Sequence, residues 1–138
     1  MSPRSPRFDC SLPSEPIRAY RLDGVYDFKG ESSKSGQLRS ARILEDKQLT
    51  LTQDARVRSV FTEVASFGGE GARCFIPGLG FTIGEGAEKV EILVCLKCYW
   101  AYFFRGDTQT VEALSDLGYR QLYEIYVDLF PAGDPAAA

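Results

Sequence analysis

The chain has 138 residues and a net charge of −3, with 44% hydrophobic and 25% charged residues, so its composition excludes an intrinsically disordered protein and fits one domain. Because the sequence contains no histidine, neither a Ser-His-Asp triad nor an imidazole metal ligand can form within it. The slightly acidic balance favours a basic protein partner over nucleic acid.

The two ends of the sequence differ from its middle. Residues 1–16 hold four of the seven prolines and show no hydrophobic periodicity, which predicts a flexible N-terminal arm. We expect a single α+β domain over 17–131 and a disordered tail over 132–138. No apolar run is long enough for a signal peptide or a membrane span, so we expect no membrane association and a cytoplasmic protein with reduced thiols.

The first half of the domain is predicted to be a hairpin followed by a helix. Apolar residues from Ile17 onward alternate along a first strand, with a bend at Gly24, and 38–45 form a weaker second strand. In this first strand, the apolar residues that fall on one parity are Tyr20, Leu22, Tyr26 and Phe28. A helix then begins at Thr50, which matches a capping box with Gln53, or at Thr52, which is an equally good cap, and it ends at Gly68-Gly69. Its predicted apolar stripe consists of Val57, Val60, Phe61 and Val64.

A second hairpin is predicted from 72–83 and 90–105. Pro77 and nearby glycines interrupt the first of these strands, and a long turn between the two would pair Leu79 with Val94. In 90–105 every even position is apolar or aromatic, which predicts one uninterrupted strand with its even face in the core. Residues three apart on a strand point to opposite faces, so Cys95 and Cys98 should diverge.

The C-terminal part is predicted to be helical. A short helix begins at Thr108 or Thr110, Gly118 interrupts it, and a second helix covers 119–130. The element order is then β-β-α-β-β-α-α. This order predicts an α+β fold with a four-stranded antiparallel sheet and helices packed on one face.

Two short motifs contain three of the four cysteines. Cys74-Phe-Ile-Pro77 is followed by Val94-Cys-Leu-Lys-Cys98. This arrangement resembles a family of small bacterial domains with the pattern Cys-Phe-x-Pro-Arg-His-Gly followed by Ile-Cys-Phe-Glu-Cys, over residues 38–100. The chain departs from that pattern at Gly78, Leu79 and Lys97, which replace its Arg, His and Glu. The resemblance therefore implies a fold more than an activity.

Cys74, Cys95 and Cys98 are the candidate metal or redox residues. A zinc site would require a bulge between Cys95 and Cys98, with Cys10 of the arm as a fourth sulfur. A redox Cys-x-x-Cys normally opens a helix, whereas this one continues into an apparent strand. A disulfide is possible only in some strand registers. The remaining alternative, which requires no cofactor, is that all three are small buried hydrophobic residues.

Residues 99–104 contain five aromatic side chains in six positions. Tyr99 and Phe103 lie on the second face of the predicted strand, where either the C-terminal helices cover them or they form a partner site ending at Arg105. We therefore expect a non-enzymatic interaction module, of immunity or antitoxin type, that binds a basic protein or a second copy through this strand. The alternative is a cysteine-based zinc or thiol-redox protein. No catalytic set is evident in the sequence.

Overall fold

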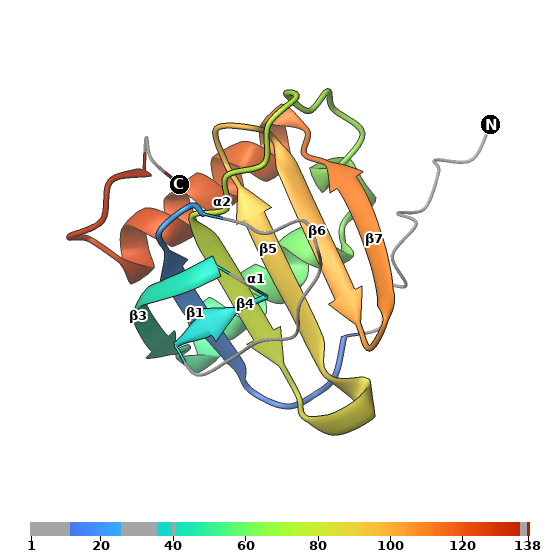
Figure 1. Cartoon of the computed structure of the whole chain (residues 1–138), viewed down its shortest axis with the longest axis vertical. Helices are drawn as coiled ribbons and strands as arrows, with labels where there is room; N and C mark the ends of the chain where they lie inside the picture. The colour runs from blue at the N-terminus through green and yellow to red at the C-terminus, as the bar shows by residue number, and fades with distance from the viewer. Residues whose placement is uncertain (1–11, 26–35, 40, 136–137) are drawn as a thin grey trace.

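The computed structural model describes residues 12–25, 36–39, 41–135 and 138, and within them one antiparallel sheet is covered by two helices (Figure 1). The strands are β1 (Ile17–Leu22), β2 (Gln37–Leu38), β3 (Ala41–Gln48), β4 (Leu79–Ile83), β5 (Val90–Cys95), β6 (Trp100–Arg105) and β7 (Thr108–Ala113). The helices are α1 (Leu51–Thr62) and α2 (Asp116–Leu129), with short 3-10 helices at Val64–Ser66 and Gly86–Glu88. Neither α-helix is long and apolar enough to cross a membrane.

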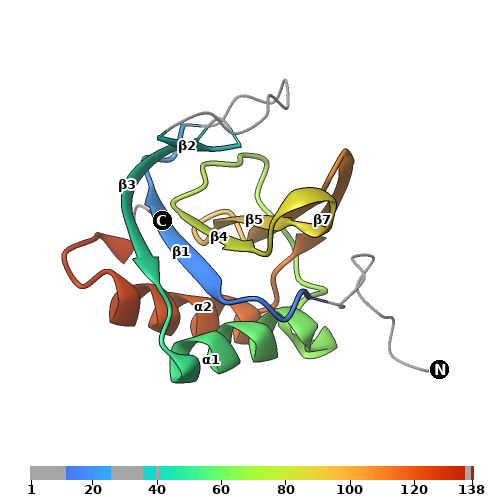
Figure 2. The same ribbon diagram turned by 90° about the horizontal axis from the view of Figure 1, so that it is seen from below.

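The sheet has seven strands in the order β2-β3-β1-β4-β5-β6-β7 among the described residues, so the predicted four-stranded sheet is wrong, although the α+β class is confirmed. Figure 2 shows both helices on one side of the sheet, while β3 and β2 curl away over the opposite side. The predicted strands 38–45 and 90–105 are each divided into two strands. Residues 108–113, at the start of a predicted helix, form the seventh strand. One of the splits occurs at Arg39, where a φ of 47° separates β2 from β3.

The largest correction concerns the predicted strand 90–105. Residues 96–99 form a turn that folds this segment into the hairpin β5–β6, with Val94 opposite Ala101. The turn is closed by the hydrogen bond from Tyr99 N to Leu96 O (3.1 Å), and Tyr99 takes a φ of 58°. Because Val94 pairs with Ala101, the even positions of β5 share a face with the odd positions of β6. The prediction that all even positions of 90–105 share one core face therefore fails beyond the turn.

The segment after β6 also differs from the prediction. Gly106 and Asp107 form a two-residue turn into β7, where the sequence predicted a helix starting at Thr108 or Thr110. Among the described residues one α-helix follows, and it begins after Ser115, whose side chain accepts a hydrogen bond from Gly118 N. Gly118 thus lies inside the first turn of α2 rather than interrupting a helix.

Each face of the sheet carries its own hydrophobic cluster. Toward the helices, Val57, Val60 and Phe61 of the predicted α1 stripe are buried against the sheet. Inside the curl lies a second cluster that consists of Leu22, Leu38, Ala41, Phe75, Leu93, Cys95, Cys98 and Phe104. The capping box of Thr50 with Gln53 and the predicted pairing of Leu79 with Val94 are both confirmed.

The two predicted terminal segments are described only in part. Tyr26, Phe28, Cys10 and residues 1–11 of the predicted arm lie outside the described residues. At the C-terminal end, Ala138 is buried in the helix-side cluster, and its carbonyl oxygen accepts a hydrogen bond from Lys97 N (3.1 Å).

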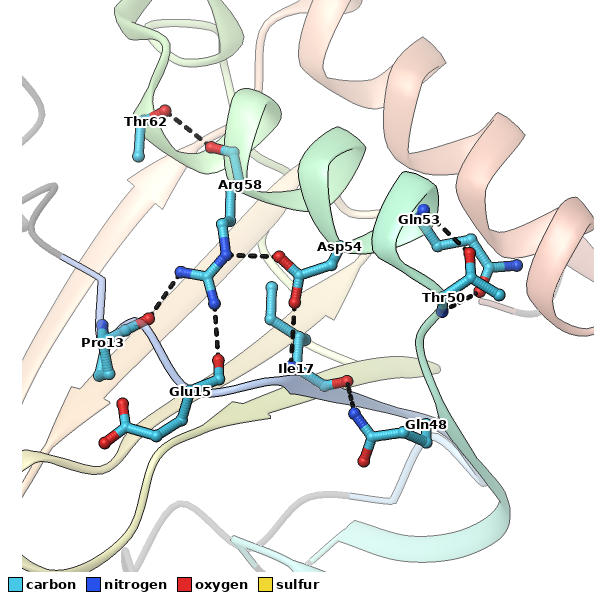
Figure 3. Close-up of polar contacts among 9 residues, drawn as sticks. All are labelled: Pro13, Glu15, Ile17, Gln48, Thr50, Gln53, Asp54, Arg58 and Thr62. Atoms are coloured by element: carbon cyan, nitrogen blue, oxygen red, sulfur yellow. Dashed lines mark hydrogen bonds and ion pairs between the residues drawn. The ribbon is translucent and has the colours of Figure 1, made fainter.

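Arg58 of α1 holds the segment that leads into β1 (Figure 3). Its guanidinium pairs with Asp54 one turn earlier and donates hydrogen bonds to Pro13 O and Glu15 O, both at 2.6 Å. Asp54 in turn accepts a hydrogen bond from Ile17 N at 3.2 Å. These charge-assisted bonds fix residues 13–17 against α1.

We expect the Arg58→Met variant to lose about 1–2 kcal/mol of unfolding free energy, because it removes charge-assisted hydrogen bonds to two carbonyl groups and one carboxylate. Urea denaturation measures the loss, and limited proteolysis should show faster cleavage before Ile17. Arg56→Met is the matched control, because Arg56 makes only an exposed 3.8 Å ion pair with Glu124. Equal effects of the two substitutions would contradict the proposed anchoring role of Arg58.

Candidate functional site

Three cysteines from two separate segments meet at the β5–β6 turn. Cys95 is the last residue of β5, Cys98 lies in the turn, and Cys74 lies in the connection between α1 and β4. The Sγ atoms of Cys74 and Cys98 are 2.8 Å apart, and the thiol of Cys98 also interacts with that of Cys95. The predicted divergence of Cys95 and Cys98 is therefore wrong, because the turn brings both into one cluster.

The segment that carries Cys74 is held against the hairpin by its backbone. Ala72 N donates a hydrogen bond to Cys98 O (2.8 Å), and Trp100 Nε1 donates one to Ala72 O (2.6 Å). A Cβ atom placed on Gly71 would lie 1.9 Å from the indole ring of Trp100, so only glycine permits this approach. The contact between Cys74 and Cys98 thus sits on a fixed backbone.

The three thiols differ in their access to solvent. The side chains of Cys95 and Cys98 are fully buried, whereas Cys74 is exposed. Next to them Phe75 stacks on Tyr102 with ring centroids 3.7 Å apart and nearly parallel planes. A reagent from solvent can therefore reach Cys74, while Cys98 lies directly behind it.

The surroundings favour the protonated form of two of these thiols. The hydrogen bond with Cys98 is the main cause that raises the pKa of Cys74 above its ordinary value. Burial is the main cause that raises the pKa of Cys98, with the interaction with Cys95 adding to it. Both residues therefore have a small thiolate fraction at neutral pH.

The distance between the sulfurs lies between the values of the two kinds of cysteine chemistry. Two sulfurs bound to one tetrahedral zinc ion at about 2.3 Å lie about 3.8 Å apart, whereas a disulfide joins them at about 2.05 Å. The 2.8 Å between Cys74 Sγ and Cys98 Sγ is thus about 1 Å shorter than the zinc geometry and about 0.75 Å longer than a disulfide bond. Among the described residues no group of three or more metal-ligating side chains is arranged to hold an ion, and Cys10 lies outside them.

The three candidate partner residues do not form one exposed surface. Phe103 is buried on the helix side of the sheet, where its ring packs edge-on against Phe61 and Phe67. Arg105 ends β6 opposite Thr108 and is half-buried. Tyr99 is also half-buried, stacks on Tyr119 of α2 and lines a surface pocket. Of the three, Tyr99 is the residue that lines this pocket.

Sequence reasoning missed the turn at 96–99 because it contains no Gly, Pro, Asn or Asp. Length was the signal that could have revealed it. A strand over 90–105 would have sixteen residues, whereas strands usually have 3–10, and Lys97 is the one charged residue near the middle of that run.

Searches of family models, of curated proteins and of solved structures find no match to this chain.

Proposed function

We propose that this chain is a thiol-redox protein in which Cys74 and Cys98 interconvert between a dithiol and a disulfide. The observation that carries the proposal is the 2.8 Å contact between their sulfurs, made by an exposed and a buried thiol on a fixed backbone. Exposure of the first thiol allows a reagent to reach it, and the closeness of the second allows the reaction to finish within the chain.

The oxidant in this proposal is a low-molecular-weight disulfide. The thiolate of Cys74 attacks one of its sulfurs, which forms a mixed disulfide and releases one small thiol. Cys98 then attacks the Cys74 sulfur of the mixed disulfide, which closes the Cys74–Cys98 bond and releases the second small thiol. The protons of the two cysteines pass to the two leaving thiolates, so two thiols are oxidised and one disulfide is reduced.

The raised pKa values support a slow switch rather than a rapid oxidoreductase. A fast catalyst keeps its attacking thiol largely as thiolate, commonly at a helix N-terminus or beside a cation. Here Cys74 lies in a loop and Cys98 in a turn, and both pKa values are raised. The pair thus suits slow thiol–disulfide exchange rather than rapid catalysis.

Treatment of the folded chain with oxidised glutathione should lower its intact mass by two hydrogens. Peptide mapping should then find one cross-linked pair, Cys74 with Cys98, because these sulfurs are already in contact. Cys74→Ser and Cys98→Ser should each abolish the cross-link. Cys95→Ser is the matched control and should retain it, since Cys95 is a buried neighbour outside the reacting pair.

A product that links Cys95 in place of either partner, or a reduced chain that resists oxidation, would refute this assignment. Native mass spectrometry of the reduced chain with added zinc tests the alternative. A stable increase equal to one zinc ion, lost in all three serine variants, would favour the metal site over the disulfide.

The expected interaction module of immunity or antitoxin type stays a prediction. Burial of Phe103 in the core removes it from the surface that this prediction proposed. What supports a binding role is the pocket beside Tyr99, which is independent of the cysteines' chemistry.

A further inference from the structure

A pocket of about 480 Å³ opens where β7 ends and α2 begins. Its lining comes from the segment after α1, the β5–β6 turn and the start of α2, and consists of Phe67, Gly68, Gly69, Glu70, Tyr99, Leu114, Ser115 and Asp116. Phe67 and Leu114 are buried, Tyr99 is half-buried, and Glu70 and Asp116 are exposed. The pocket thus combines part of an aromatic side chain with two carboxylates.

Backbone hydrogen bonds fix the pocket's walls. Gly68 N donates to Ala113 O (3.0 Å), and Ser115 N donates to Ser66 O (2.9 Å). A Cβ atom on Gly69 would lie 2.1 Å from Leu114 O, so the two walls approach each other as closely as glycine allows. Backbone contacts therefore hold together two of the segments that line the hollow.

The charges of the lining are of one sign. Glu70 and Asp116 carry the formal charges, and no Lys or Arg is among the described lining residues. The Tyr99 hydroxyl donates a hydrogen bond to Asp116 (3.3 Å), and burial together with this carboxylate raises the pKa of Tyr99, so the phenol stays neutral. The N-terminus of α2 adds about half a positive charge, which two carboxylates outweigh.

We propose that this pocket binds the guanidinium group of an arginine side chain presented by a basic protein partner. A planar guanidinium has five N–H donors for carboxylate partners such as Glu70 and Asp116, and it packs favourably against an aromatic ring such as that of the half-buried Tyr99. Ammonium groups are compact and strongly hydrated, so an aromatic lining residue suits them less. The net charge of −3 would also speed the approach of a basic partner.

Titration of the full, reduced chain with N-acetyl-arginine amide, followed by amide NMR spectra, tests the proposal. The amide signals of Gly68, Gly69 and Glu70 should shift and saturate, because these residues line the pocket. N-acetyl-citrulline amide has the same shape without the charge and should leave the signals unmoved. N-acetyl-lysine amide should bind at least several-fold more weakly.

Two double variants separate pocket binding from general attraction to an acidic protein. Glu70→Gln with Asp116→Asn should weaken arginine binding about tenfold or more, since it removes both charge-assisted partners. Glu85→Gln with Glu88→Gln removes the same charge from an exposed turn elsewhere and should leave the affinity unchanged. Equal shifts with citrulline or lysine, shifts spread over the surface, or equal loss in both double variants would each overturn the proposal.

Discussion

The Phe103→Ala variant is expected to lose about 3–5 kcal/mol of unfolding free energy, the cost of removing a large aromatic side chain from a closed core. Phe103 is about 1% exposed and lies between Phe61 of α1 and Phe67, with ring centroids 5.7 and 5.9 Å away. Alanine would leave a cavity between the sheet and α1. Urea denaturation followed by the fluorescence of Trp100, the single tryptophan, measures the change.

Tyr123→Ala is the control for this prediction, because Tyr123 is an aromatic residue on the outer side of α2 with 36% of its surface exposed. Its loss should cost about 1 kcal/mol or less. If Phe103→Ala kept the stability of the parent chain, Phe103 would not be a core residue, and its assignment to a partner surface would stand again.

Gly118→Ala is expected to destabilise the chain by about 3 kcal/mol, although alanine normally stabilises a helix by up to about 1 kcal/mol relative to glycine. The reason is the close approach of α2 to the 3-10 helix after α1. A Cβ atom on Gly118 would lie 2.1 Å from Ser66 O, far inside ordinary van der Waals contact. Because the obstacle is backbone, α2 as a whole would have to move.

Urea midpoints of Gly118→Ala and of Arg120→Ala test this prediction. Arg120 is an exposed residue of the same helix, so its replacement by alanine should change the stability by about 0.5 kcal/mol or less. A stabilised Gly118→Ala variant would show that helix propensity outweighs the contact, and that α2 does not pack as closely on Ser66 as described.

Displacement of α2 also bears on the proposed arginine pocket. The lining residues Ser115 and Asp116 lie within three residues of Gly118, and Ser115 N donates a hydrogen bond to Ser66 O. A shift of α2 would therefore move one wall of the pocket, while the Cys74–Cys98 contact is anchored separately through Ala72 and Trp100. Disulfide formation in Gly118→Ala should accordingly persist where arginine binding is lost.

Local patterns in the sequence determined the features that depend on neighbouring residues. The capping box at Thr50 and the pairing of Leu79 with Val94 follow from spacing over a few positions, and the structure confirms them. Three of the four predicted stripe residues, Val57, Val60 and Phe61, are buried in α1, whereas Val64 lies beyond the helix and is half-buried. Hydrophobic periodicity likewise predicted the α+β class, because apolar residues alternate in some segments and recur at helical spacing in others.

Tertiary structure decided where long apolar segments fold back. Residues 96–99 lack turn-forming residues, and the positive φ of Tyr99 is accepted because Leu114 N bonds Tyr99 O and the rings of Tyr99 and Tyr119 stack. Strand 108–113 forms because β6 offers an open edge beside it. Both outcomes depend on partners distant in sequence. The contact of Cys74 with Cys98 follows from the turn at 96–99, because only a reversal of the chain there places Cys98 beside the loop after α1.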